Sequence, residues 1–200
     1  MTVKILDNCC SPDSLDFLKL VATAADNWNL QYPIGIDETT GEEIPFEDKF
    51  LKLDIINNGI RNPYLAGLAM GLLIQIHEAG GQDLFIPEIW YCSISIKDKH
   101  RPDNIHIDHE ASGPNSLANA SDNFIKVMGV INSDWEEEWG GSFFHDGTSY
   151  YAKPTSFYIF DQLKPHAADE IFTDKKRLAI DFTVFRNQQS LNNYMVKSGN

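Results

Sequence analysis

The sequence predicts a mainly β protein, in which antiparallel sheets pack as a sandwich or jelly roll and helices come early in the chain. Two observations lead to this fold class. Residues 1–87 contain two stretches with apolar residues at three- and four-residue intervals, which indicate helices. Residues 88–185 contain about eight short runs of β-branched and aromatic residues, separated by turn signals and with no helical stretch between them.

Length and composition predict a single folded domain covering residues 1–200. The chain has 200 residues, of which 42% are hydrophobic and 22% are charged, and these values are typical of folded soluble domains. We expect residues 1–87 to form a mostly helical support, residues 88–185 to form the β core, and residues 186–200 to form a C-terminal tail.

Two helices are expected before the β core. The first should begin at Ser11-Pro12, because the serine hydroxyl can cap a helix and proline needs no hydrogen-bond partner at the first helical position. It should run to about Trp28. The second should begin at Pro63 and end at Gly80-Gly81. Between them, residues 32–54 are rich in proline, glycine and acidic residues, which predicts an irregular connection.

Short strands are expected to follow the second helix. Asp146-Gly147 is a typical hairpin turn and should divide one of the strand-like runs into two strands. Strands without helices between them pack as antiparallel sheets, and the early helices should cover one sheet. The predicted strand segments are residues 88–96, 104–108, 123–133, 142–152, 156–160, 166–171 and 177–185.

The charge of the chain disfavours some classes of partner. The formal net charge is −13, which repels nucleic acid and anionic membrane surfaces. No apolar stretch approaches the roughly 18 to 20 residues that cross a bilayer, and the N-terminus lacks the features of a secretory signal. We therefore expect a cytoplasmic protein without nucleic acid or membrane partners. Cys9, Cys10 and Cys92 lack metal-site spacing and are predicted to be reduced thiols without a role.

The segment around His106 and Asp108 is the main indication of chemistry. In an extended strand these two side chains point to one face, whereas Ile105 and Ile107 point to the other. An imidazole and a carboxylate, joined by a second histidine, form the facial triad that holds Fe(II) and leaves coordination positions open. His166 stands at the start of a predicted strand and is the candidate for that second histidine.

Arg177 begins the last predicted strand and lies on its less apolar face. Apolar residues occupy every second position of residues 177–185, and the arginine heads the other set. A guanidinium group is planar and permanently charged, and it can bind a carboxylate through two hydrogen bonds. Lys175 and Lys176 precede it, and either lysine could replace it as the anchor if the strand starts earlier.

The other histidines are weaker candidates. His77 and His100 are expected to have no role, and His145, next to the predicted turn, is expected to be exposed. His109 would face away from the ligand pair in a continuing strand, although a turn could bring it back as a ligand or toward the substrate. Gly140-Gly141 predicts a tight turn or bulge, because no helix or Lys-Ser/Thr pair follows as in a phosphate loop.

Six segments of the second half follow one another in a recognisable order. They are His106-Ile107-Asp108, Val130-Ile131-Asn132-Ser133-Asp134-Trp135, Trp139-Gly140-Gly141-Ser142-Phe143, Phe157-Tyr158-Ile159-Phe160, Pro165-His166 and Arg177-Leu178-Ala179-Ile180. In this order they resemble the Fe(II)- and 2-oxoglutarate-dependent dioxygenases, most closely the prolyl 4-hydroxylase-like branch. The resemblance covers residues 88–185, and the order of the motifs is more specific than any one of them.

The resemblance implies a double-stranded β-helix (jelly-roll) core covered by the N-terminal helices. It implies that His106, Asp108 and His166 ligate Fe(II) and act in catalysis, and that Arg177 binds the distal carboxylate of 2-oxoglutarate. The family's reaction uses O2 and 2-oxoglutarate, releases succinate and CO2, and hydroxylates a C–H bond. The expected substrate is a prolyl residue in a peptide or protein, or a small molecule.

Departures from the family pattern leave alternatives open. Relatives often have a hydroxyl residue where this chain has Ala179 and a tyrosine where it has Val130, so the second contact to 2-oxoglutarate is unassigned. Residues 110–122 form a polar loop long enough to be a lid over the substrate. The alternative function is a cupin-like protein that binds metal and a small molecule without redox chemistry. The oligomeric state is not predicted.

Overall fold

Two antiparallel sheets form the centre of the molecule. The computed structural model describes residues 2–31, 34–36, 43–45, 50–99, 103, 105–107 and 123–197. In these residues β3 (Ile34–Ile36) pairs with β4 (Glu43–Pro45) apart from the two main sheets. The large sheet has seven strands, in the order β1 (Lys4–Leu6), β10 (Phe157–Phe160), β7 (Phe124–Val130), β12 (Arg177–Phe185), β6 (Ile89–Lys97), β5 (Phe50–Ile56) and β2 (Asn29–Gln31). The small sheet has three strands, in the order β11 (His166–Ala168), β8 (Phe143–His145) and β9 (Thr148–Tyr150).

Alternation along β12 gives the large sheet an apolar face and a mixed face. Leu178, Ile180 and Phe182 are buried in the main hydrophobic core. Arg177 and Asp181 lie on the opposite face, because successive side chains of a strand point to opposite sides of a sheet. β12 has neighbours on both sides, β6 and β7, and is therefore a central strand.

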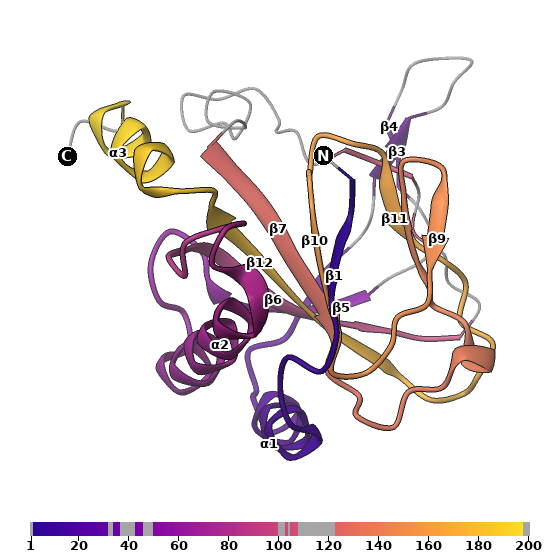
Figure 1. Cartoon of the computed structure of the whole chain (residues 1–200). Coiled ribbons are helices and arrows are strands. Elements are labelled where there is room, and N and C mark those ends of the chain that lie inside the picture. The colour runs from indigo at the N-terminus through magenta and orange to yellow at the C-terminus, as the bar shows by residue number, and fades with distance from the viewer. Residues whose placement is uncertain are drawn as a thin grey trace.

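The main helices cover the apolar face of the large sheet, opposite the small sheet (Figure 1). Ser11 and Asn62 cap the first two, each accepting a hydrogen bond of 3.1 Å from a backbone N–H of the first turn. Buried leucines of these helices share one core with the apolar face of β12. The helical elements are α1 (Pro12–Thr23), α2 (Pro63–Ile76), its π-helical extension η1 (His77–Gly81), the short turn η4 (Glu137–Trp139) and α3 (Gln188–Lys197).

The small sheet packs over the mixed face of the large sheet. Phe143 of β8 and Tyr158 and Phe160 of β10 form a second buried cluster, and Met128 of β7 packs against it. Since the two sheets enclose this cluster between them, the molecule has the expected jelly-roll architecture: a mainly β core with helices on the outside of one sheet.

Several predicted elements are confirmed. Both helices begin at the predicted prolines, and β12 spans the last predicted strand. Asp146 and Gly147, with φ values of 47° and 87°, form the turn between β8 and β9. Each of these elements has a strong local signal. The helices have a capping residue before proline, β12 has regular alternation, and the hairpin has an Asp-Gly turn.

Other predictions about the first half were wrong. α1 ends at Thr23 rather than at Trp28. The chain beyond Thr23 is not helical, and the indole N–H of Trp28 donates a hydrogen bond to the Ala22 carbonyl at 3.1 Å. The predicted irregular connection contains most of β5, in which buried Leu53 and Ile55 alternate with polar residues.

Predictions for short segments were also incomplete. The predicted C-terminal tail contains α3, and β1 was not predicted. The predicted strand at 166–171 ends at Ala168. Of the predicted strand at 104–108, only residues 105–107 are described, and His106 makes an isolated bridge to His166.

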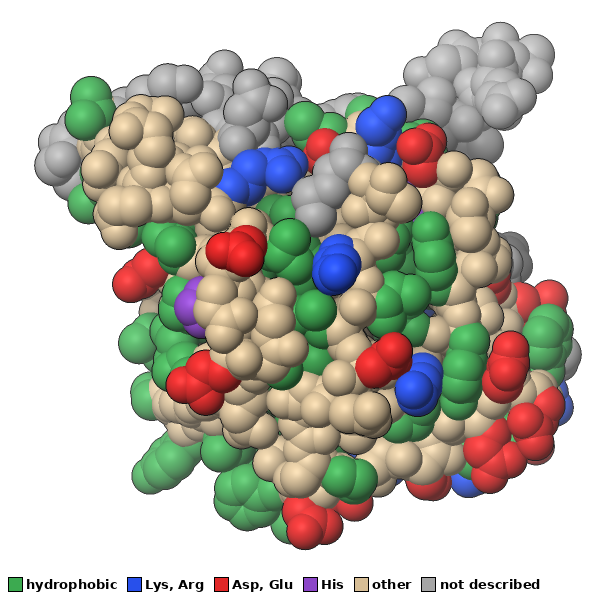
Figure 2. Space-filling model, viewed as in Figure 1, with side chains coloured by type: hydrophobic (Ala, Val, Ile, Leu, Met, Phe, Trp, Pro, Cys, Tyr) green, Lys and Arg blue, Asp and Glu red, His purple; other side chains and the backbone are tan. Residues whose placement is uncertain are grey.

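The surface is rich in acidic side chains. Figure 2 shows them spread over one face, with apolar side chains between them. Among the described helices, none combines the length and apolar content needed to cross a membrane.

Candidate active site

Two of the predicted metal ligands lie side by side at the edge of the small sheet. The His106 N–H donates to the His166 carbonyl at 3.0 Å, and the His166 N–H donates to the His106 carbonyl at 2.8 Å. Their imidazole rings are 4.5 Å apart between centroids. His166 is buried, whereas His106 is exposed. The segment at 105–107 thus continues the small sheet beyond β11 and holds both imidazoles on one sheet.

The hydrogen bonding of His166 defines its tautomer. Nδ1 lies 2.8 Å from the Lys164 carbonyl oxygen. Because a carbonyl can only accept, Nδ1 holds a proton, and in the neutral imidazole that a metal ligand requires Nε2 then has the lone pair. A backbone carbonyl in this role is the usual support of a histidine that ligates a metal.

Asp108 lies outside the described residues, as do His100 and His109. In the described ranges, no three His, Cys, Asp or Glu side chains are grouped closely enough to hold a metal ion. The structure therefore brings His106 and His166 together, and the third ligand stays a prediction. The predicted lid at 110–122 also falls outside the described residues.

Arg177 is buried on the mixed face, with only 2% of its surface exposed. In the described part of the chain, neither its Nε nor its Nη2 has a hydrogen-bond partner. Burial lowers the pKa of Arg177, although Asp103 and Tyr158 oppose this effect. Arginine stays charged even so, because its ordinary pKa is far above neutral. A buried cation with unpaired N–H groups calls for an anion.

Gly141 leaves space for the arginine stem. Both Gly140 and Gly141 have positive φ, 75° and 70°, in agreement with a tight turn before β8. A Cβ atom on Gly141 would lie 2.8 Å from Cδ of Arg177 and 3.2 Å from its Nε. Only glycine fits at this position without moving the guanidinium group.

The neighbouring lysines lie in a different environment. Lys175 and Lys176 have side chains that are 49% and 61% exposed, and they pair with Asp134 at 3.3 Å and Asp98 at 3.8 Å. Of these three cations, only the arginine enters the space between the sheets.

Asp103 is a residue of this site that the sequence analysis missed. Its carboxylate accepts hydrogen bonds from the Lys97 ammonium and from the Ala168 N–H of β11. Burial would raise the pKa of Asp103, but Lys97, aided by His106 and Arg177, lowers it overall. Since Asp103 lies in a charged loop without periodicity, no sequence pattern distinguished it.

His145 was predicted to be exposed, and this was wrong: it is 2% exposed. It pairs with His166 across β8 and β11, and its Nε2 is 3.2 Å from the Asp161 carbonyl oxygen. Burial lowers the pKa of His145, and the nearby His166 lowers it further. Its ring packs against Phe160, 5.4 Å away between centroids. A residue next to a two-residue turn is usually exposed, but His145 is buried because β8 pairs with β11 on one edge and with β9 on the other.

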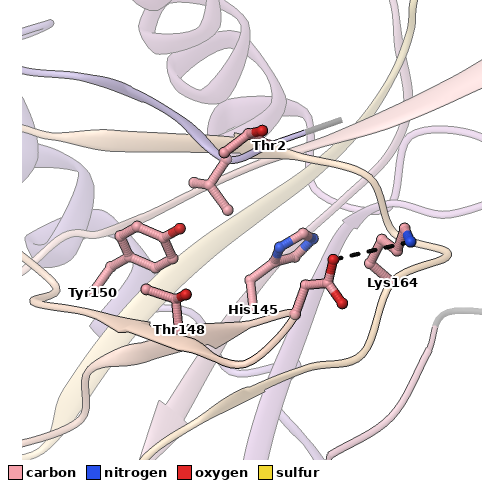
Figure 3. Close-up of a pocket in the computed structure, with 7 residues that line it drawn as sticks. Thr2, His145, Thr148, Tyr150 and Lys164 are labelled. Atoms are coloured by element: carbon pink, nitrogen blue, oxygen red, sulfur yellow. Dashed lines mark ion pairs between the residues drawn. The ribbon is translucent and has the colours of Figure 1, made fainter.

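A cavity of about 300 Å³ opens beside His145. Figure 3 shows the imidazole between Tyr150 and the ion pair of Asp146 and Lys164, whose charged atoms are 3.9 Å apart. Thr148 lies directly opposite His145 in the β8–β9 pair and shares its face. The remaining lining comes from Thr2 and Val3, just before β1.

Comparison with solved structures identifies the architecture. No protein-family model and no curated protein sequence matches the chain. Three similar structures are a 2OG-Fe(II) oxygenase family oxidoreductase from Burkholderia pseudomallei, a collagen prolyl hydroxylase of Paramecium bursaria Chlorella virus-1 in complex with 2OG, and HygX from Streptomyces hygroscopicus with nickel, 2-oxoglutarate and hygromycin B bound.

These similarities extend over nearly the whole chain at low identity. The first has a TM-score of 0.64 at 12% identity and covers 92% of this chain and 85% of that chain. The viral enzyme has a TM-score of 0.55 at 9% identity, with 94% and 97% covered. HygX has a TM-score of 0.56 at 10% identity, with 93% and 83% covered. The chain therefore has the jelly-roll fold of the 2-oxoglutarate- and Fe(II)-dependent oxygenases.

Proposed function

We propose that residues 1–200 form one domain, an Fe(II)- and 2-oxoglutarate-dependent dioxygenase that hydroxylates a C–H bond. The single observation that supports this most strongly is the buried guanidinium of Arg177, whose Nε and Nη2 have no hydrogen-bond partner among the described residues, on the face of the large sheet over which the small sheet holds the imidazoles of His106 and His166.

The residues present fit the metal. His106 and His166, with Asp108, would supply two imidazoles and a carboxylate, the ligand set of non-haem Fe(II) oxygenases. The protonated Nδ1 of His166 leaves Nε2 as its ligating atom. Bound Fe(II) with 2-oxoglutarate and O2 supplies the oxidising chemistry, which couples release of succinate and CO2 to hydroxylation of the substrate.

The residues also fit the co-substrate. Nε and Nη2 lie on the same edge of a guanidinium group, and together they form the two-pronged donor that binds a carboxylate. Lys97 stands opposite Arg177 on β6 and is paired with Asp103, whereas Nε and Nη2 of Arg177 have no hydrogen-bond partner among the described residues. One distal carboxylate of 2-oxoglutarate would satisfy both its charge and its unpaired N–H groups.

The prolyl hydroxylase-like resemblance favours a prolyl residue in a peptide or protein as the hydroxylated group. HygX, which has the same fold, was crystallised with hygromycin B, so the architecture also accommodates small molecules.

The proposal is tested by co-substrate turnover. With Fe(II), O2 and 2-oxoglutarate, the protein should release succinate, and H106A and D108A should abolish this release because each removes a metal ligand. R177A should weaken 2-oxoglutarate binding much more than metal binding, whereas the exposed control K176A should change neither. Succinate release that persists in both ligand variants would contradict the proposal, and metal binding without 2-oxoglutarate binding would indicate the cupin-like alternative.

A further inference from the structure

On the face that holds Arg177, a second residue has a buried polar atom without a hydrogen-bond partner in the described part of the chain. One carboxylate oxygen of Asp181, Oδ2, accepts a hydrogen bond from the Lys126 ammonium at 2.7 Å. The other, Oδ1, is buried, and nothing in the residues that the structure describes donates a hydrogen bond to it. The side chain as a whole is 33% exposed, although Oδ1 itself is covered.

The strand register places Asp181 near the level of the imidazole pair. Thr183 of β12, Lys126 of β7 and Phe160 of β10 pair side by side across three strands. The Phe160 ring is 5.1 Å from the His166 ring between centroids. Asp181 is one row away from this line on the same face of the sheet.

Arg177 lies at the other end of the same face. Four residues of strand separate it from Asp181, a distance of about 13 Å. Along β12, Asp181 therefore stands between Arg177 and the level of the imidazole pair, one row from that level.

The charges around Asp181 define what it can bind. Lys126 has a side chain only 8% exposed, and it neutralises the carboxylate. An ammonium group placed at Oδ1 would meet the Lys126 ammonium nearby, and a carboxylate would meet Asp181 itself. An uncharged group that donates a hydrogen bond, a hydroxyl or an amide, satisfies Oδ1 without either repulsion.

Asp54 shows that the unpaired oxygen is particular to Asp181. Both aspartates pair with Ser93 of β6, from its two sides, and so lie in one row of the sheet. Asp54 has both oxygens bonded, to the Tyr91 hydroxyl at 3.0 Å and to the Asn57 amide at 2.9 Å. The sheet can therefore satisfy a carboxylate at this level, and at Asp181 it does so only for one oxygen.

We propose that Asp181, held in place by Lys126, is a specificity-determining residue that accepts a hydrogen bond from an uncharged hydroxyl or amide of the oxidised substrate. This inference rests on the proposed function, in which the substrate reacts beside the metal that His106 and His166 would hold. Asp181 and Lys126 together select substrates by charge. Uncharged amide or hydroxyl groups are accepted at this position, and free amines and carboxylic acids are disfavoured.

Four proline derivatives of similar shape test this selection. N-acetyl-prolinamide and N-acetyl-prolinol are uncharged, N-acetyl-proline is an anion, and prolinamide is a cation. Their dissociation constants are measured by ligand-observed NMR in the presence of Mn(II) and 2-oxoglutarate, so that no turnover occurs. The two uncharged probes should bind the wild-type protein about tenfold or more tightly than the charged ones, and their ranking shows whether amide or hydroxyl is preferred.

Variants locate the effect at Asp181. D181N should weaken binding of the uncharged probes about tenfold, because the amide turns its oxygen to Lys126 and presents a donor to the probe. D54N, the matched control in the same row, should leave the affinities unchanged. The double variant K126M/D181L removes the buried pair together, which is often tolerated, and should abolish the preference for uncharged probes.

The outcomes separate this inference from the proposed function. Equal binding of charged and uncharged probes, no binding of the uncharged probes, or unchanged affinities in D181N would overturn the role of Asp181 even if succinate is released. Conversely, the predicted pattern of affinities without succinate release would leave the subsite standing and refute the dioxygenase assignment.

Discussion

Three residues contain buried side-chain atoms without a hydrogen-bond partner in the described ranges: Gln162, Arg177 and Asp181. Such atoms are uncommon in folded proteins, because leaving one unpaired costs about 1–3 kcal/mol. The proposed co-substrate and substrate would satisfy the arginine and the aspartate. Nothing in the described part of the chain explains the fully buried amide of Gln162.

Replacing Gly141 by alanine should disturb the arginine as well as the backbone. Alanine at φ 70° costs about 1–2 kcal/mol, and its Cβ would in addition lie 2.8 Å from Cδ of Arg177. We expect G141A to lower the free energy of unfolding, measured by chemical denaturation, by about 2 kcal/mol or more. We also expect it to weaken 2-oxoglutarate binding, measured by titration calorimetry, about tenfold.

Gly147 provides the matched control for this substitution. Its φ of 87° is similarly left-handed, but a Cβ there would meet no heavy atom within 4 Å. G147A should therefore show the backbone cost without the loss of 2-oxoglutarate binding. Equal affinities in the two variants would show that the Gly141 contact does not position Arg177.

At the scale of elements, the strength of the local signal decided how much of the fold could be predicted. β12 was predicted in full because its alternation is regular over nine residues. β1 and β2 were missed because strands of three residues have no periodicity to detect. α3 was missed because its residues are mostly polar, and in β5 the neighbouring acids hid the alternation.

The candidate site was predictable only in part for the same reason. His106 and His166 could be linked through the order of the motifs, although they are far apart in the sequence and meet only through sheet pairing. The burial of His145 and the contacts of Asp103 depend on which strands become neighbours. Pairing of that kind is not encoded in any local pattern.

The Asp103 carboxylate should hold the His106 segment against β11. Asp103 bonds to the Ala168 N–H at 3.2 Å and to Lys97, and its own N–H bonds to the Ala168 carbonyl at 2.8 Å. D103N removes the charge that pairs with Lys97, which should lower the local stability of the His106 segment by about 1–3 kcal/mol. The backbone amide hydrogens of His106 and His166 should therefore exchange faster.

Hydrogen exchange measured residue by residue checks this prediction. Asp174 is the control, since its side chain is 92% exposed in its pair with Lys99 and an exposed pair adds at most about 1 kcal/mol. D174N should leave the protection of both histidine amides unchanged. Unaltered protection in D103N would mean that backbone pairing alone fixes the segment.

For the whole molecule, the dominant electrostatic feature is its net charge of −13. Ion pairs such as Lys153 with Asp7 and Lys19 with Asp134 are largely exposed, and each contributes about 0–1 kcal/mol. Repulsion among the excess acidic groups should outweigh them and reduce stability at low ionic strength.

Salt should therefore stabilise the protein. Raising NaCl from about 0.01 to about 0.15 M shortens the screening length from roughly 30 to roughly 8 Å, and the midpoint of thermal unfolding at pH 7 should rise. At the isoelectric point, near pH 4.7, the same change of salt should have little effect. A midpoint that falls with salt at pH 7 would show that favourable ion pairs outweigh the repulsion.

One consequence follows from the fact that a single strand, β12, carries both Arg177 and Asp181 on the same face. The regular geometry of β12 fixes the distance between Arg177 and Asp181. The only shift of register between β12 and β6 comes later, between Thr183 and Val184. Inserting one residue between Arg177 and Asp181 would turn one of these side chains to the apolar face of the sheet. The distance between the proposed co-substrate anchor and the proposed substrate contact can thus change only in steps of two residues.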